Sequence, residues 1–343
     1  MAKTSAGRFF EDYWIGQVID HAVPRTLSGG ERALYHALYP ARHALQSSDE
    51  FARACGLPAA PLDDLIAFHT VFGKSVPDIS INAVANLGYA EGRFLRPVMP
   101  GDTLRATSEV IGLKQNSNGR SGVVYVRTRG MDQHDRCVLE YCRWVMVRKG
   151  NPDAPAPATV IPELAAAVTP DALVIPEGLD FSDYDVTQAG EPHRWGDYST
   201  GEIIDHVDGV TVEEAEHMMA TRLWQNTSKV HFDASLRPDG RRLIYGGHVI
   251  SLARALSFNG LANAQMIVAI NAGAHASPCF AGDTVHAWSE VLDRADTPAP
   301  GVGALRLRLV ATRGHAPAEL RDADGKYLPD VLLDLDYWAL IPT

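Results

Sequence analysis

DYWIGQVIDH, at residues 12–21, has a counterpart later in the chain in DYSTGEIIDH, at residues 197–206. A second pair follows in the same order, RPVMPGDTL at residues 96–104 and ASPCFAGDTV at residues 276–285. Two matches in the same order, at slightly different spacings, indicate that one unit was duplicated and then gained or lost a few residues. The repeat therefore predicts two copies of one fold in a single chain.

The stretch between the two copies is rich in proline. It begins with GNPDAPAP at residues 150–157, where proline fixes φ and removes backbone donors, so that neither a helix nor a strand is expected. A length of 343 residues suits two domains. We therefore predict an N-terminal domain over residues 1–150, a linker over residues 151–177 and a C-terminal domain over residues 178–343.

Each copy carries the same order of secondary-structure signals. An extended segment leads into a polar, helix-prone stretch near Ser28 or Thr211, and Thr211 with Glu214 has the spacing of a capping box. Apolar residues repeat at helical spacing over residues 248–256. Strands rich in β-branched and aromatic residues are expected at residues 122–128, 139–147, 304–312 and 331–341. A long helix with several antiparallel strands predicts an α+β domain whose sheet curls around the helix.

Composition and charge exclude several classes of protein. Hydrophobic residues make up 46% and charged residues 21%, the balance of a globular protein with a hydrophobic core. A net charge of −11 argues against a nucleic-acid partner. No stretch approaches the roughly eighteen apolar residues of a membrane span, and the N-terminus resembles no signal peptide. The 4 cysteines lack CxxC spacing, so we expect a cytoplasmic protein without a metal or cofactor.

The order of elements, together with the Pro-x-x-Pro/Ala-Gly-Asp-Thr turn, resembles the hot-dog fold of MaoC-like hydratases over nearly the whole chain. The resemblance implies a tandem, or double, hot-dog fold in which each antiparallel sheet wraps around a long central helix. Asp102 and Asp283 of the turn are expected to bond nearby backbone amides, and Gly101 and Gly282 to take positive φ. Because exposed sheet edges tend to pair, the two halves should form a pseudo-dimer, and a homodimer of such subunits is expected.

The resemblance also implies a catalytic site in the second half. MaoC-like hydratases carry a pattern similar to Asp-x-Asn-Pro-x-His-x-Asp ahead of the central helix, and residues 226–233, NTSKVHFD, match its end with His231 and Asp233. Asn226 stands in place of the aspartate, which argues against a two-residue acid/base scheme. Hydration of an unsaturated thioester needs an activated water and a proton donor, and a histidine can serve both at neutral pH. His231 is therefore expected to transfer protons, Asn226 to hold the water and Asp233 to orient the imidazole.

The helix start YGGH, at residues 245–248, resembles the glycine-rich entry that forms the oxyanion hole of these enzymes. The Gly247 amide is the expected donor to the thioester oxygen, since it lies at the positive end of a helix dipole. Gly246 and His248 are expected beside the substrate. The resemblance implies an acyl-CoA ligand and no further cofactor.

The first half departs further from the family pattern. It keeps His43, expected to line the pocket, but has Leu38 where the acid would stand. We therefore expect this half to shape the pocket and the CoA channel. Over its full length the chain is similar to the mesaconyl-CoA (2-methylfumaryl-CoA) hydratase group, which implies a substrate with a free carboxylate. The cations near the motif that could bind this carboxylate are Arg222, Lys229, Arg241 and Arg242.

Other functions remain open from sequence alone. Acyl-CoA thioesterases use the same fold with a carboxylate at the central helix, and Asp63 and Asp64 occupy that region of the first half. A generic (R)-specific enoyl-CoA hydratase is a second alternative. A non-catalytic acyl-CoA-binding module is a third, although no basic segment or DNA-binding helix pair suggests an output.

Overall fold

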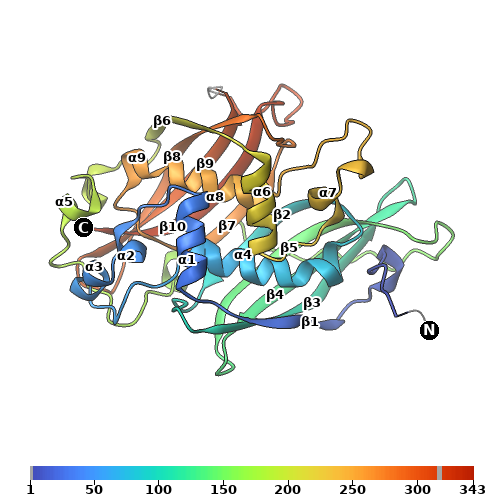
Figure 1. Cartoon of the computed structure of the whole chain (residues 1–343), viewed down its shortest axis with the longest axis horizontal. Coiled ribbons are helices and arrows are strands. Elements are labelled where there is room, and N and C mark those ends of the chain that lie inside the picture. The colour runs from blue at the N-terminus through green and yellow to red at the C-terminus, as the bar shows by residue number, and fades with distance from the viewer. Residues whose placement is uncertain (1–2, 315–318) are drawn as a thin grey trace.

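The strands form one continuous sheet. The computed structural model describes residues 3–314 and 319–343, and within them ten strands pair in the order β1-β3-β4-β5-β2-β7-β10-β9-β8-β6 (Figure 1). The strands are β1 Val18–Thr26, β2 Ala83–Phe94, β3 Thr103–Gln115, β4 Ser121–Met131, β5 Cys137–Arg148, β6 Ile203–Thr211, β7 Met266–His275, β8 Thr284–Asp296, β9 Val302–Arg313 and β10 Val331–Pro342. The four strands expected from sequence correspond to β4, β5, β9 and β10.

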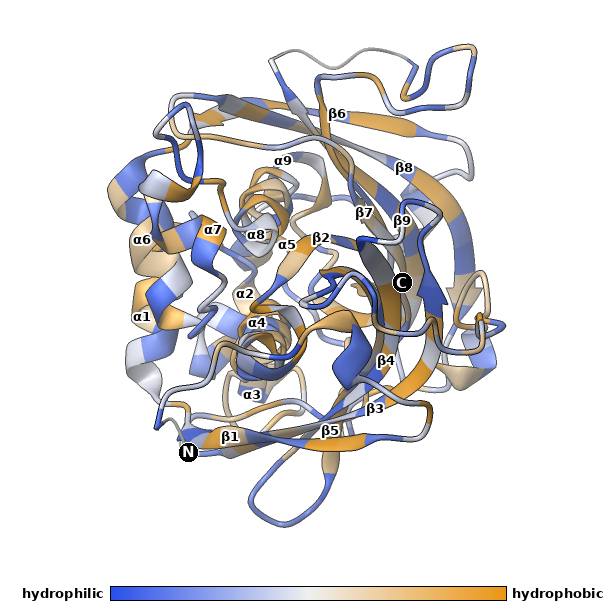
Figure 2. Ribbon diagram, turned by 90° about the vertical axis from the view of Figure 1, so that its right-hand side faces the viewer, coloured by the Kyte–Doolittle hydropathy of each residue, from blue (hydrophilic) through white to orange (hydrophobic). Residues whose placement is uncertain are grey.

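Two central helices, α4 and α8, lie inside the curve of this sheet, and α1 and α6 close its open side (Figure 2). The helices are α1 Gly29–Leu38, α2 Ala44–Ser47, α3 Asp49–Ala54, α4 Asp64–Ser75, α5 Val186–Ala189, α6 Glu214–Leu223, α7 Lys229–Phe232, α8 Gly246–Leu256 and α9 Phe258–Leu261. A sheet curved around one long helix in each half is the α+β arrangement that the sequence predicts.

The two halves are joined edge to edge by β2 and β7. These strands pair antiparallel, from Tyr89 opposite Gly273 to Arg93 opposite Ala269. Five strands from each half thereby become a single sheet, and the predicted pseudo-dimer of the two halves is confirmed.

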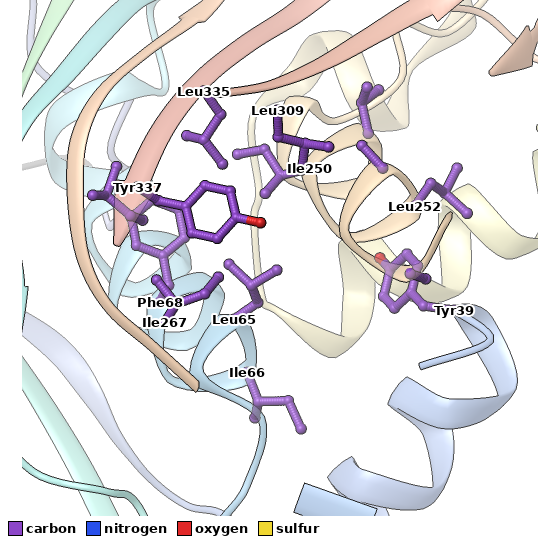
Figure 3. Close-up of a cluster of buried hydrophobic side chains, with 14 of the residues drawn as sticks. Tyr39, Leu65, Ile66, Phe68, Ile250, Leu252, Ile267, Leu309, Leu335 and Tyr337 are labelled. Carbon is purple, nitrogen blue, oxygen red and sulfur yellow. The ribbon is translucent and has the colours of Figure 1, made fainter. Parts of the chain in front are cut away.

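The two central helices share one hydrophobic core with the sheet. Leu65 and Phe68 of α4 and Ile250 of α8 lie against Leu335 and Tyr337 of β10 (Figure 3). All five side chains are buried. Since burying one such side chain is worth about 1.5–3 kcal/mol, this shared core helps to hold the two halves together.

The repeated histidines have the same structural role in both halves. Nε2 of His21 lies 2.8 Å from the Ser108 hydroxyl on β3, and Nε2 of His206 lies 2.8 Å from the Ser289 hydroxyl on β8. Each histidine therefore fastens the edge strand of its half to the neighbouring strand, which explains why the motif recurs.

The repeated turn is also structural, as expected. The carboxylates of Asp102 and Asp283 accept hydrogen bonds from the amides of Met99, at 2.8 Å, and Phe280, at 2.9 Å. The glycines before them adopt positive φ, +105° at Gly101 and +91° at Gly282.

The capping box expected at Thr211 is wrong. Thr211 ends β6, and its hydroxyl lies 2.8 Å from the Thr284 hydroxyl across the sheet, so that it cannot cap α6. The motif occurs instead in the first half, where the Ser28 amide donates to the Glu31 carboxylate at 2.6 Å. The spacing predicted that the Thr211 hydroxyl would cap the helix, but this hydroxyl contacts Thr284 across the sheet instead.

The proline-rich connection contacts both halves. Val160 exchanges backbone hydrogen bonds of 2.8 and 2.9 Å with Leu113 of the first half, and the Trp338 indole of the second half donates to the Val168 carbonyl at 3.0 Å. The boundaries at residues 150 and 178 stay a prediction. In the described part of the chain no helix is long and apolar enough to cross a membrane.

Candidate active site

A cavity of about 330 Å³ opens between the two halves. The first half lines it with the C-terminal part of α4, β2 and β5, and the second half with the loop before α7, the start of α8 and the end of β7. Most of the lining is apolar, and its polar groups therefore define what it can bind.

His231 lies in this lining, on the short helix α7. Its Nδ1 lies 2.7 Å from the Leu243 carbonyl oxygen, which can only accept, so Nδ1 carries the proton and Nε2 is the unprotonated nitrogen. Nε2 has no partner among the described residues and is not fully enclosed. Burial lowers the pKa of His231 to about 4, so that the imidazole is neutral at pH 7. The side chain is thus a hydrogen-bond acceptor and a base.

Asn226 also lines the cavity, and the two polar atoms of its side chain have different surroundings. Oδ1 accepts from the Ser228 amide at 3.1 Å and shapes the loop that leads into α7. Nδ2 has no partner in residues 3–314 and 319–343, so it can donate to a water in the cavity.

The first half positions this loop. The Arg25 guanidinium donates to the Leu223 carbonyl at the end of α6, and Gly73 of α4 packs directly on the Trp224 carbonyl. A Cβ at Gly73 would overlap that carbonyl, so a glycine is required where α4 meets the loop. The loop that carries Asn226 is therefore held by residues far away in sequence.

The starts of the two central helices differ in a way that bears on function. At α4, Asp63 is the N-cap, and its carboxylate accepts from the Leu65 amide at 2.9 Å. At α8 the N-cap is Tyr245, which makes no side-chain capping bond. The first amides of α8, at Gly246 and Gly247, consequently keep their donors free, and Gly246 lies in the cavity lining. An uncapped helix start can bind a developing negative charge.

Both glycines are required by their surroundings. A Cβ at Gly246 would overlap the His275 ring, and one at Gly247 would overlap the Tyr245 ring. Nε2 of His275 in turn lies 3.0 Å from the Tyr89 hydroxyl, which links the start of α8 to β2 of the first half. Gly247, the donor expected from sequence, is buried one residue inside the helix and is not among the described residues that line the cavity, whereas Gly246 is.

Asp233 does not orient His231, contrary to the sequence-based expectation. Its side chain is exposed, and Oδ1 accepts from the Ser235 amide at 2.9 Å and the Ser235 hydroxyl at 2.6 Å. It caps the short 3₁₀ turn Ala234–Leu236. The Leu243 carbonyl orients the imidazole instead.

The structure does not bring His248 or His43 to the cavity. His248 points into the core, with Nδ1 3.0 Å from the Tyr39 hydroxyl, and His43 packs against the Phe258 ring. Both side chains are buried. Of α8, only Gly246 and Val249 are among the described residues that line the cavity, and His43 stands at the start of α2, away from it. Their predicted contacts with the acyl group are corrected accordingly.

Arg222 and Lys229 also lie outside the cavity, and both are exposed. Arg222 borders a separate hollow between α1 and α6. These two side chains are close to the motif in sequence but not to the cavity in space, because they lie on the exposed faces of α6 and of the start of α7.

The carboxylates that suggested a thioesterase lie elsewhere too. Asp63 caps α4, and Asp64 accepts from the Gln46 side chain at 2.7 Å and the Ile267 amide at 2.9 Å. No Asp or Glu occurs among the described residues that line the cavity. Nor do the described ranges contain a group of His, Cys, Asp or Glu side chains that could hold a metal ion.

Several polar residues of the lining were not anticipated from sequence. Arg143, Asn86 and Ser80 come from the first half, and Tyr245 and His275 from the second. The Tyr245 hydroxyl lies 3.2 Å from Nδ1 of His69. The site is therefore composite, because both halves supply polar groups to the cavity that holds the base.

The architecture defines a class, the MaoC-type double hot-dog proteins. The structure matches a MaoC domain protein from Chloroflexus aurantiacus J-10-fl with a TM-score of 0.97 and 56% identity, covering 100% of this chain and 99% of that one. It also matches a conserved Mycobacterium tuberculosis protein described as a double hotdog fold, with a TM-score of 0.77 and 28% identity, covering 98% of each chain. The double hot-dog fold implied by the family resemblance is thus confirmed.

Within this class, the chain belongs to the mesaconyl-CoA hydratase family, which it matches over residues 2–317. It is 78% identical over 341 residues to the mesaconyl-CoA hydratase of Cereibacter sphaeroides, covering 99% of both chains. It is 56% identical over 347 residues to the beta-methylmalyl-CoA dehydratase of Chloroflexus aurantiacus, again covering 99% of both.

Proposed function

We propose that this protein is a hydro-lyase that reversibly hydrates mesaconyl-CoA to β-methylmalyl-CoA. The observation that carries the proposal is the neutral His231, with its free Nε2 in a cavity between the halves, in a chain 78% identical to a mesaconyl-CoA hydratase. The residue roles that follow are part of the proposal.

His231 performs both proton transfers. Its Nε2 removes a proton from a water, whose oxygen attacks the β carbon and opens the C=C bond. The electron pair moves to the thioester oxygen, and the resulting imidazolium then protonates the α carbon. Because burial lowers the imidazole pKa to about 4, the protonated ring is more acidic than an ordinary imidazolium and gives up its proton more readily. Asn226 holds the water through Nδ2, which fixes the direction of attack.

The start of α8 stabilises the enolate oxygen. The free amides of Gly246 and Gly247 and the positive end of the helix dipole can face the charge that develops there. No carboxylate of the described lining opposes that charge. This role favours hydration over thioester hydrolysis, which would need a nucleophile or base beside the carbonyl carbon.

Gly246→Ala is expected to lower kcat/KM for mesaconyl-CoA by about 10²–10³-fold, the typical effect of losing one oxyanion donor. The added Cβ would displace either His275 or the first turn of α8. Gly29→Ala is a matched control, because Gly29 likewise begins a helix but an added Cβ there would meet no atom within 4 Å. Steady-state kinetics with a thermal melt of each variant separates the two. Equal activity in Gly246→Ala and wild type would remove the helix start from the site.

Mass spectrometry of the products tests the function itself. Purified enzyme is incubated with mesaconyl-CoA and with enoyl-CoAs that lack the free carboxylate, and the masses of the products are measured. We expect mesaconyl-CoA to gain one water and to be preferred over the others. Release of free CoA without a hydrated product would mean that the protein is a thioesterase and not a hydratase. Equal rates with all enoyl-CoAs would favour a generic enoyl-CoA hydratase.

We propose that the enzyme works in the cytoplasm, which is consistent with cysteines 55, 137, 142 and 279 all being unpaired. We also propose that double hot-dog subunits form homodimers, which sedimentation or light scattering would test.

A further inference from the structure

We propose that Arg143 of the first half binds the free carboxylate of the acyl group and thereby selects a dicarboxylic acyl-CoA. This inference rests on the proposed function and names the group that recognises its substrate. The juxtaposition that carries it is a buried, unpaired guanidinium in the lining of the cavity that holds His231.

Arg143 is the unusual residue of the cavity. Its side chain is 0% exposed, yet within residues 3–314 and 319–343 no Asp or Glu forms an ion pair with it. One hydrogen bond holds it, from Nη2 to the Ser75 hydroxyl at 2.8 Å, while Nε and Nη1 are buried without partners. Burying a charge without a counter-charge is costly, so such a group is expected to meet an anion when the site is occupied.

Arg254 provides an internal comparison. It is also a buried arginine, at 4% exposure, that pairs with no Asp or Glu of the described residues, but it donates to the Ser257 hydroxyl at 3.1 Å and to the carbonyls of Ala264 and Gln265. None of its nitrogens is buried without a partner, and it does not line the cavity. Its surroundings satisfy a structural arginine, whereas those of Arg143 leave donors free.

The guanidinium of Arg143 is held in place with one binding edge free. It stacks on the Phe72 ring at 4.4 Å, and the Ser75 hydroxyl that accepts from it donates in turn to the Phe72 carbonyl at 2.7 Å. Nη2 has one hydrogen on each two-nitrogen edge of the guanidinium, and Ser75 uses only one of them. Either the Nε–Nη2 edge or the Nη1–Nη2 edge therefore keeps both of its hydrogens unpaired, which is the geometry for a two-point bond to a carboxylate. Since Nε and Nη1 are themselves buried, a carboxylate reaches this edge by displacing a side chain that covers it.

The position of Arg143 suits the chemistry. On β5 it is directly opposite Tyr89 of β2, whose hydroxyl contacts His275 at the end of β7, beside Gly246. With strands about 4.8 Å apart and His275 two residues beyond Gly273, which lies opposite Tyr89, Arg143 and His275 are anchored roughly 12 Å from each other across the cavity wall. Mesaconyl-CoA has its thioester at one end of the acyl group and its carboxylate on the β carbon, where water adds. The thioester at α8 and the carboxylate at Arg143 would bracket the reacting double bond.

Other polar groups nearby support an anion site. Both side-chain polar atoms of Asn86 and the Ser80 hydroxyl are buried without partners and line the same cavity. Asn86 lies opposite Val145 in the register of β2 and β5, on the same face as Arg143. Each can donate to a carboxylate oxygen that Arg143 leaves uncovered.

The cations considered from sequence do not compete for this role. Arg242 pairs with Glu214 at 2.9 Å and borders the separate hollow, and Arg241 is exposed and stacks on Phe280 at 4.3 Å. With Arg222 and Lys229 also outside, Arg143 is the one lysine or arginine in the described lining.

The test compares two substrates that differ only at this group. Tigloyl-CoA carries a methyl where mesaconyl-CoA has its carboxylate. In Arg143→Met, kcat/KM for mesaconyl-CoA is expected to fall by about 10- to 10²-fold, the typical effect of a lost bond to a charged group, while the value for tigloyl-CoA stays level or rises. Arg143→Lys keeps the charge without the two-point geometry and should fall in between.

Binding of saturated analogues gives a readout independent of turnover. Methylsuccinyl-CoA, with the carboxylate, should lose affinity in Arg143→Met, and 2-methylbutyryl-CoA, without it, should not. Arg254→Met is the matched control and should leave the ratio of affinities unchanged. A thermal midpoint of Arg143→Met at or above that of wild type would fit a residue kept for ligand binding.

The outcomes distinguish this inference from the function on which it rests. If wild type hydrates mesaconyl-CoA but Arg143→Met and Arg143→Lys change both substrates and both analogues alike, the guanidinium is structural and the inference is overturned alone. If wild type does not hydrate mesaconyl-CoA, the proposed function fails first.

Discussion

His231→Gln is expected to reduce kcat/KM for mesaconyl-CoA by about 10²–10⁴-fold, the range found for loss of a general acid–base group. Glutamine can fill much of the space and still bond the Leu243 carbonyl, but its amide cannot accept a proton from water. The variant should therefore bind substrate with an affinity close to that of wild type and fail in the chemical step, which pre-steady-state measurement of hydration would resolve.

His134→Gln is the control for that substitution. His134 is exposed and lies in the turn after β4, outside the cavity lining, so its replacement should leave the rate unchanged. If His231→Gln keeps near wild-type hydration, the base is another group, and Tyr245 or His275 of the same lining would be examined next.

The pH profile offers a second view of the same residue. Since burial lowers the pKa of His231 to about 4, the free enzyme holds the active, neutral form throughout the neutral range. kcat/KM should be flat from about pH 8 to pH 6, because it reports the ionisation of the free enzyme. An acid limb centred near 6.5, the ordinary histidine value, would contradict this environment.

Acidification is expected to destabilise the protein steeply between about pH 6.5 and pH 4. In that window the unfolded chain binds protons on histidines that the folded chain keeps neutral, so the free energy of unfolding falls as pH falls. Burial lowers the pKa to about 3 or 4 in His69, His206, His217, His231, His248 and His275. Each contributes a slope of about 1 kcal/mol per pH unit inside the window, and together they rival the usual total stability of a domain.

Two neighbouring buried carboxyls, Asp63 and Asp64, act in the opposite direction, because burial raises the pKa of each. Burial raises the pKa of Asp64 to about 8, so the folded state holds one proton there that the unfolded state releases. This offsets only a fraction of the histidine effect. Urea midpoints measured from pH 7.5 to pH 4.5 should therefore drop continuously below pH 6.5.

Proton uptake provides the quantitative check. Potentiometry at pH 5 should detect several protons bound per chain on unfolding, and His206→Gln, outside the active site, should remove about one of them. A stability that stays constant down to pH 5 would mean that the buried histidines titrate normally.

The fold was predictable because the repeated segments have a direct structural cause. The histidine and turn motifs fasten edge strands and start new strands in both halves, so that the pattern in sequence is the pattern in space. The strands rich in β-branched residues and the helix α8 were predictable as well, because their periodic apolar residues face the core. Thr211 was misjudged because a cross-strand partner competed for its hydroxyl.

The site was only partly predictable. His231 and Asn226 do line one cavity, but Asp233, two residues beyond His231, falls after α7 has ended and faces solvent. Spacing in a motif does not say where a short helix stops. Arg222 and Lys229 show the same limit for cations chosen by their nearness in sequence.

Arg143 left a signal that strand alternation could have revealed. Leu139, Tyr141, Val145 and Val147 occupy one face of β5 with period two, and Arg143 falls on this apolar face. An arginine at a core position of a predicted strand needs an explanation. Its link to His231 could not be seen from sequence, because it depends on β2 and β7 joining the two halves.

The pairing of β2 with β7 within one chain has a genetic consequence. In a dimer of identical units, every substitution appears at both sites, and a residue useful at one must be tolerated at the other. Here the residue before Trp144 of β5 is arginine, whereas the residue before Trp338 of β10 is tyrosine. The start of α4 is capped by the Asp63 side chain, whereas the start of α8, at Gly246, has no side-chain cap among the described residues. The two copies are free to mutate separately. A tight-binding inhibitor should accordingly bind with a stoichiometry of one per chain. The equivalent position in the other half would then have only a structural role.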